Sequence, residues 1–82
     1  MNEKLNIKPD VVADFSGKQC GDLAISLMKK MKTLEGGQVL KVRALDAGAV
    51  NDIPAWCRMT KNELLAGPCG EDRGYYYIKK KQ

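Results

Sequence analysis

The stretch that decides the fold is Leu23–Leu34, which reads LAISLMKKMKTL. Its apolar residues recur at the three- and four-residue spacing of one helical face. The stripe consists of Leu23, Leu27, Met31 and Leu34, with Ala24 and Met28 beside it. Lysines occupy other positions, and the following pair Gly36-Gly37 is expected to end the helix. We therefore predict an amphipathic helix, and we assign its methionines to the core rather than to a ligand site.

Four further segments have the features of β-strands. Val11–Phe15 and Val39–Leu45 alternate between two sets of side chains, which is the period of a strand. Glu63–Gly67 and Gly74–Lys79 flank a turn-forming segment that contains proline and glycine, residues 68–73. This arrangement predicts an antiparallel hairpin formed by the last two strands.

A second helix is predicted over Asp52–Thr60. Asp52 is a plausible N-cap, and Pro54 would fall in the first turn, where its missing N–H costs little. The residues that would share one helical face are Ile53, Trp56, Cys57 and Thr60. Cys57 is therefore expected to be buried.

The predicted order of elements is β-α-β-α-β-β. This order indicates an α+β two-layer sandwich, in which two helices cover one face of a four-stranded mixed sheet and leave the other face to solvent. Residues 1–8 are expected to form a loose N-terminal lead-in, and residues 9–82 a single domain. A chain of 82 residues with 44% hydrophobic content is sufficient for one modest core.

Composition excludes several classes of protein. No apolar run approaches the roughly 20 residues that a membrane helix needs, and the first residues lack the apolar core of a signal peptide. Three cysteines, an odd number, fit a reducing compartment, so a cytoplasmic location is expected. The chain has no histidine and no Cys-x-x-Cys pair, which argues against a metal site, and we expect no cofactor. The net charge of +4 suits docking on acidic partners or RNA.

Cys20 is the candidate reactive residue. It lies where the extended segment ends and the first helix begins, beside the unpaired N–H groups and the positive dipole end of that helix. These conditions favour the thiolate, which is the nucleophilic form of cysteine. Gly17 and Gly21 flank Cys20 with little bulk, whereas Lys18 favours the thiolate and Asp22 opposes it or caps the helix. The alternative is a half-buried cysteine that only fills space.

Several motifs extend outward from this cysteine. They are Asp14-x-x-Gly17-x-x-Cys20, Gly36-Gly37-x-Val39-Leu40-x-Val42, Asp46-x-x-Ala49-x-x-Asp52-Ile53-Pro54-Ala55-Trp56-Cys57 and Tyr76-x-Ile78-Lys79. With these motifs, the sequence from about Val11 to Lys80 resembles the TusA/SirA-like sulfur-carrier family. It departs from the family at one motif, because the family's Cys-Pro-x-Pro stands here as Cys20-Gly21-Asp22-Leu23.

The resemblance implies a sulfurtransferase-type carrier that holds a persulfide on Cys20. Its partners would be a sulfur-donor protein, such as a cysteine desulfurase or a rhodanese-like protein, and a sulfur-acceptor protein. The family serves tRNA thiolation, cofactor biosynthesis and sulfur metabolism, and the sequence leaves the choice open. Exchange of sulfur proceeds through the thiolate itself, so the lack of histidine argues against hydrolases and not against a carrier.

The alternative function is a non-catalytic interaction, regulatory or RNA-binding module on the same fold. Leu40, Val42 and Ala44 are expected on the core side of their strand. The side chains expected on the open sheet face are Lys41, Arg43, Tyr75, Tyr77 and Lys79. Basic side chains interleaved with tyrosines can contact phosphates and stack on bases, and the other interpretation is an ordinary solvated face. Cys69 is expected to be an exposed bystander in the hairpin loop.

Overall fold

The computed structural model of the protein describes residues 7–17 and 20–82, with Cys20 and Glu71 described by their backbone only. Its elements are β1 (Val11–Asp14), α1 (Cys20–Met31), β2 (Val39–Arg43), α2 (Ala49–Thr60), β3 (Glu63–Cys69), the short 3-10 helix η2 (Glu71–Arg73) and β4 (Tyr75–Lys79). The predicted order of helices and strands is therefore confirmed. Most of the expected N-terminal lead-in, residues 1–6, lies outside the described residues.

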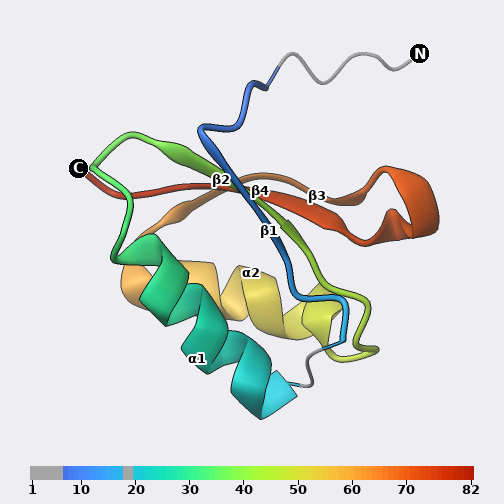
Figure 1. Cartoon of the computed structure of the whole chain (residues 1–82). Helices are drawn as coiled ribbons and strands as arrows, with labels where there is room; N and C mark the ends of the chain where they lie inside the picture. The colour runs from blue at the N-terminus through green and yellow to red at the C-terminus, as the bar shows by residue number, and fades with distance from the viewer. Residues whose placement is uncertain (1–6, 18–19) are drawn as a thin grey trace.

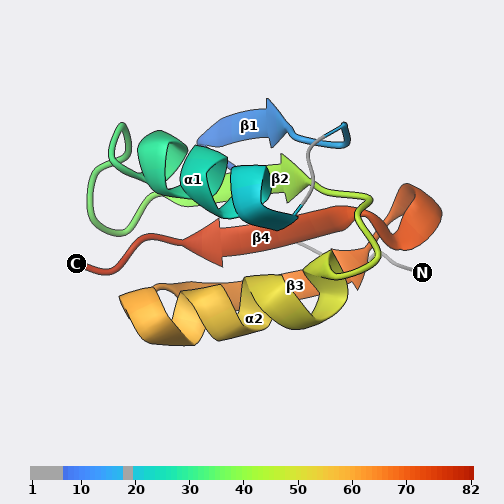
Figure 2. The same ribbon diagram turned by 90° about the horizontal axis from the view of Figure 1, so that it is seen from below.

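The four strands form one mixed sheet in the spatial order β1-β2-β4-β3. β1 runs parallel to β2, and the two other pairs, β2 with β4 and β3 with β4, are antiparallel. Both helices lie on the same side of this sheet, as Figure 1 shows. Seen from that side, α1 lies over β1 and β2 while α2 lies along β3 (Figure 2). The predicted two-layer sandwich is confirmed.

The core lies between the sheet and the helices. Each layer contributes the residues that its periodicity predicts: Leu40, Val42, Tyr76 and Ile78 from the sheet, Leu23, Leu27 and Met31 from α1, Leu34 after it, and Ile53 and Cys57 from α2. Leu40 and Ile78 face each other in the register of β2 and β4, and neither is exposed. Burial of this apolar surface is the main favourable contribution to folding.

The boundaries of α1 and β2 differ from the prediction. α1 begins at Cys20 rather than Leu23, because Cys20-Gly21-Asp22 forms a polar first turn that apolar periodicity does not reveal. It ends at Met31, and Gly36-Gly37 belongs to a later turn. In that turn Gly37 has a φ of +91° and donates its N–H to the carbonyl oxygen of Lys80. β2 ends two residues early, at Arg43.

The start of α2 is a second correction. The N-cap is Gly48 and not Asp52, so Pro54 lies inside the helix beyond its first turn. The earlier start is explained by Asp46, whose carboxylate accepts the N–H of Gly48 at 3.0 Å and whose carbonyl accepts the N–H of Ala49 at 2.9 Å. Ala49 then joins the core, being 1% exposed.

β3 is longer than predicted and continues through Pro68 to Cys69. Proline is compatible with a strand at the edge of a sheet, where one row of N–H groups has no partner strand. β3 is such an edge strand. The hairpin is confirmed, but its connection is shorter than expected and consists of Gly70, η2 and Gly74.

Candidate functional site

Cys20 is the first residue of α1, which the chain reaches from the end of β1. The exit from β1 is fixed by two hydrogen bonds: Phe15 N–H donates to the carbonyl oxygen of Arg43 at 2.8 Å, and Ser16 N–H donates to Asp14 Oδ1 at 2.9 Å. The bond from Ser16 lowers the pKa of the Asp14 carboxyl group. Asp14 is therefore a turn residue that directs the chain toward Cys20. Lys18, which was expected to support the site, lies outside the described residues.

The start of α1 provides backbone donors at the position of Cys20. The first N–H groups of a helix have no acceptor within it, and they form the positive end of the helix dipole. Gly21 is the second residue of the helix, and a side chain placed there would meet no heavy atom within 4 Å. The surroundings of Gly21 are thus open. Asp22 lies within the first turn and is exposed, so it does not act as the N-cap.

Leu23 is the fourth residue of α1. Its side chain is 1% exposed and packs in the core. Leu23 and Leu27 of α1 meet Ile53 and Trp56 of α2 around a small apolar hollow. Leu23 therefore anchors the first turn of α1 through packing.

The two other cysteines, Cys57 and Cys69, lie in surroundings that shield their thiols from solvent. Cys57 is 2% exposed on the buried face of α2, as predicted, and burial raises the pKa of its thiol to about 11. Cys69 was expected in an exposed loop, but it ends β3, is half-buried and donates its S–H to the carbonyl oxygen of Tyr75 at 3.4 Å. Burial raises the pKa of Cys69, opposed by the positive charges of Lys41 and Arg73. Both thiols are therefore disfavoured as nucleophiles near neutral pH.

The structure brings together the side chains expected on the open sheet face. Lys41 pairs with Tyr77 in the register, Arg43 with Tyr75 and Val39 with Lys79. Lys41 Nζ lies 4.4 Å from the ring centroid of Tyr75 and 5.7 Å from that of Tyr77, and the Arg43 guanidinium lies 5.7 Å from that of Tyr75. These are distances at which a cation is attracted to an aromatic ring. The rings of Tyr75 and Tyr77 therefore already interact with cations of the same chain.

The open face also contains carboxylates. Arg43 Nη2 donates to Asp72 Oδ2 at 3.1 Å, Asp14 lies opposite Arg43 in the register, and Glu63 lies opposite Lys79. The ion pair between Arg43 and Asp72 could not be predicted from periodicity. It depends on an unusual turn, in which Asp72 has a φ of 59°. The ring of Tyr77 is covered as well, with 9% of the residue exposed. The positive charge of this face is consequently balanced by its own acidic neighbours.

Neither a metal site nor a membrane span emerges from the part of the chain that the structure describes. No three of the described His, Cys, Asp and Glu residues gather closely enough to hold a metal ion. None of the described helices is sufficiently long and apolar to cross a membrane.

Comparison with known proteins gives consistent matches over nearly the whole chain. The family described as Sulfurtransferase TusA matches residues 12–80. The putative sulfur carrier protein YrkI of Bacillus subtilis (strain 168) is 36% identical over 74 residues, which cover 90% of this chain and 99% of the relative. The sulfur carrier protein TusA of Pseudomonas putida (strain GB-1) is 37% identical over 75 residues, which cover 89% of this chain and 91% of the relative.

Proposed function

This chain belongs to the TusA family of sulfurtransferases, and we propose that it carries sulfur as a persulfide on Cys20. The observation that supports this assignment is the contrast between the three cysteines. Cys20 begins a helix, whereas burial raises the pKa of Cys57 and Cys69. The helix start is the setting in which a thiolate is stabilised by backbone donors and by the dipole.

Loading would proceed by thiol–persulfide exchange. The Cys20 thiolate attacks the terminal sulfur of a persulfide on the donor protein, forming a new S–S bond while the donor's own S–S bond breaks. The electron pair of the broken bond leaves with the donor cysteine as its thiolate. No oxidant is consumed, and the donor would be a cysteine desulfurase or a rhodanese-like protein.

Transfer onward repeats the same exchange in the other direction. A thiolate of the acceptor protein attacks the terminal sulfur on Cys20 and releases the Cys20 thiolate. The sulfur would then enter tRNA thiolation, cofactor biosynthesis or another branch of sulfur metabolism. Gly21 suits both steps, because it adds no bulk beside Cys20 and retains an N–H that proline would lack.

The test is onward transfer by two complementary cysteine variants, one that keeps only Cys20 and one that lacks only Cys20. A variant with Cys57→Ala and Cys69→Ser keeps Cys20 and should pass sulfur from a cysteine desulfurase to a rhodanese-like acceptor. The matched variant with Cys20→Ser keeps the other two thiols and should pass none. Equal transfer by the two variants would contradict the assignment of Cys20.

The RNA-binding alternative receives less support from the geometry. Base stacking requires an accessible aromatic face. Tyr75 is occupied by Lys41 and Arg43, and Tyr77 is nearly buried. We therefore retain the sulfur carrier as the function that the residues support best.

A further inference from the structure

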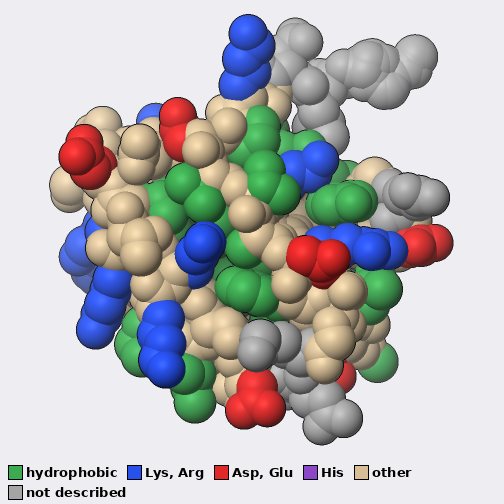
Figure 3. All heavy atoms as spheres, in the orientation of Figure 1, with side chains coloured by type: hydrophobic (Ala, Val, Ile, Leu, Met, Phe, Trp, Pro, Cys, Tyr) green, Lys and Arg blue, Asp and Glu red, His purple; other side chains and the backbone are tan. Residues whose placement is uncertain are grey.

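Basic side chains concentrate at the end of the molecule where both helices finish. Lys29 and Lys30 lie in the last turn of α1, and Arg58 in the last turn of α2. We define the basic end as Lys29, Lys30, Lys32, Arg58, Lys61, Lys79, Lys80 and Lys81. Figures 1 and 2 both show the C-terminus and the C-terminal ends of α1 and α2 at the same side of the molecule. In Figure 3 several blue side chains lie on that side, at the left of the view, and others lie at the top and right.

Hydrogen bonds hold the segments of the basic end together. Lys80 accepts the N–H of Gly37 at 2.9 Å, and the N–H of Lys81 donates to Asn62 Oδ1 at 2.9 Å. These bonds connect the residues after β4 to the turn before β2 and to the residues after α2. The cluster is therefore a fixed feature of the fold and not only a charged tail.

The charge of this end is only partly balanced. Two carboxylates lie at this end: Glu63 lines the same hollow as the lysines, and Asp10 accepts the N–H of Val39, the register partner of Lys79. A favourable interaction with the helix dipole accounts for cations in the last turns of α1 and α2. It does not account for Lys79, which ends β4, or for Lys80 and Lys81, which follow that strand.

The other end of the molecule, where both helices begin, carries several acidic side chains. Asp22 lies in the first turn of α1 and Asp52 in the first turn of α2, with Asp46 just before it. Cys20 lies at that end. A helix of 12 residues separates the two ends by about 18 Å. Arg73 shares a hollow with Asp46 and Asp72, so this end carries both signs of charge, whereas the basic end offers an acidic partner segment a denser group of cations.

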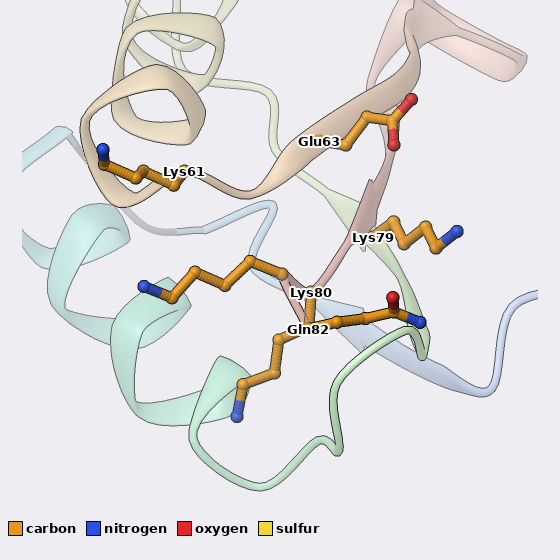
Figure 4. A pocket seen from close by; sticks show the side chains of 6 residues that line it. Lys61, Glu63, Lys79, Lys80 and Gln82 are labelled. Atoms are coloured by element: carbon orange, nitrogen blue, oxygen red, sulfur yellow. The ribbon is translucent and has the colours of Figure 1, made fainter.

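The cations are spread over a surface and do not converge on a point. A hollow of about 170 Å³ lies among Lys61, Glu63, Lys79, Lys80, Lys81 and Gln82. Figure 4 shows the side chains of Lys61 and Lys79 pointing in opposite directions from it. Such an arrangement suits several carboxylates along a segment better than one small anion.

Exposed methionines accompany the lysines. Met59, beside Arg58, is 76% exposed, and Met28, beside Lys29, is 45% exposed. Methionine is an adaptable apolar contact that recurs on protein-binding surfaces. The hollow has no aromatic ring in its lining, so it offers no platform for stacking bases. These features favour a protein segment over a nucleic acid.

We propose that the basic end is a docking surface for an acidic, partly apolar segment of a partner protein. A partner bound there leaves the start of α1 uncovered, so that one protein can hold the carrier while Cys20 exchanges sulfur with another. The docking itself does not require a loaded Cys20, and Cys20→Ser should bind the segment unchanged. Failure of docking is thus distinguishable from failure of sulfur transfer.

The test measures binding of a short fluorescent peptide that alternates glutamate and leucine. The variant K32E/K81E changes two exposed lysines of the basic end. The control K41E/R73E makes the same change in net charge near Tyr75, at the other end of β4. We expect K32E/K81E to weaken binding about tenfold or more and the control to change it little, because close charge pairs discriminate position as well as total charge. The neutral variant K32Q/K81Q should weaken binding to a smaller extent.

Three results would overturn the proposal. Equal weakening by the two charge-reversed variants would show a response to net charge alone. Absence of peptide binding to the unchanged protein at low salt would contradict the proposed docking surface. Tighter binding of a short RNA duplex than of the peptide, lost in K32E/K81E, would assign the surface to nucleic acid instead. Far-ultraviolet circular dichroism of each variant checks that the fold is retained.

Discussion

Lys80 donates a hydrogen bond from Nζ to the carbonyl oxygen of Leu34 at 2.6 Å. This bond connects the residue that follows β4 to the residue that completes the apolar stripe of α1. Lys80 is partly buried, whereas its neighbour Lys81 is exposed. The two adjacent lysines of the basic end therefore differ in function: one is structural and the other is available to a partner.

The first prediction concerns this difference. Lys80→Met should lower the free energy of unfolding by about 1–2 kcal/mol, because it leaves the Leu34 carbonyl without its charged donor. Lys81→Met should change the free energy of unfolding by less than about 0.5 kcal/mol, as is usual for surface substitutions. Urea unfolding of the two variants measures both values. Equal stabilities would contradict the structural role of Lys80.

Substitution by alanine is predicted to change the stability of the fold in opposite directions at two glycines. Gly21 lies within α1 with open surroundings, so Gly21→Ala should raise the free energy of unfolding by up to about 1 kcal/mol through reduced flexibility of the unfolded chain. Gly37 has a φ of +91°, and a Cβ there would lie 2.9 Å from Gln82 Nε2. Gly37→Ala should therefore destabilise. Thermal unfolding gives the sign of each change, and a loss of stability in Gly21→Ala would show that Gly21 is required by the local conformation.

A third prediction follows from the buried thiol. The pKa of Cys57 is about 11 in the folded protein, above the value of about 8.5 expected in the unfolded chain. The unfolded state thus loses its proton first, and the contribution of Cys57 to stability is complete below pH 8.5 and is lost as the pH rises toward 11. Cys57→Ala should make stability fall less steeply between these two pH values. Urea unfolding across this range measures it, and an unchanged slope would contradict the assignment.

The open face provides a fourth prediction. Tyr75→Leu should leave any affinity for a single-stranded RNA oligonucleotide unchanged, because the Tyr75 ring already contacts Lys41 and Arg43. Loss of one stacked base costs about 1–3 kcal/mol, so a stacking role would appear as a clear drop in affinity. Fluorescence titration at low salt measures it. Such a drop would restore the RNA-binding alternative.

The fold could be predicted where apolar periodicity is strong. The stripe of Leu23, Leu27 and Met31 and the alternation of Leu40 and Val42 are buried as expected, because each pattern has a single face that can be removed from water. The layers and the mixed sheet follow from these elements. The confirmed family resemblance depends instead on particular residues spread along the chain.

The remaining features depend on contacts that a pattern does not contain. The early start of α2 depends on the hydrogen bond between Asp46 and Gly48. Pro54, in contrast, suggests that the helix begins later in the sequence. The partial burial of Cys69 depends on continuation of β3 through Pro68. The basic end arises only when the ends of three separate elements meet in space, so its lysines appear in the sequence as unrelated positions.

The most direct measurement of the central claim is peptide mass spectrometry of the protein after incubation with a cysteine desulfurase and cysteine. The account predicts that the mass of sulfur is added to the peptide that contains Cys20, that reductant removes it, and that Cys20→Ser abolishes it while retaining the fold. Alkylation at graded pH of protein that has not been exposed to the desulfurase should show Cys20 reacting at lower pH than Cys57 and Cys69, whose pKa values are raised. Sulfur found on Cys57 or Cys69 with none on Cys20 would contradict the account.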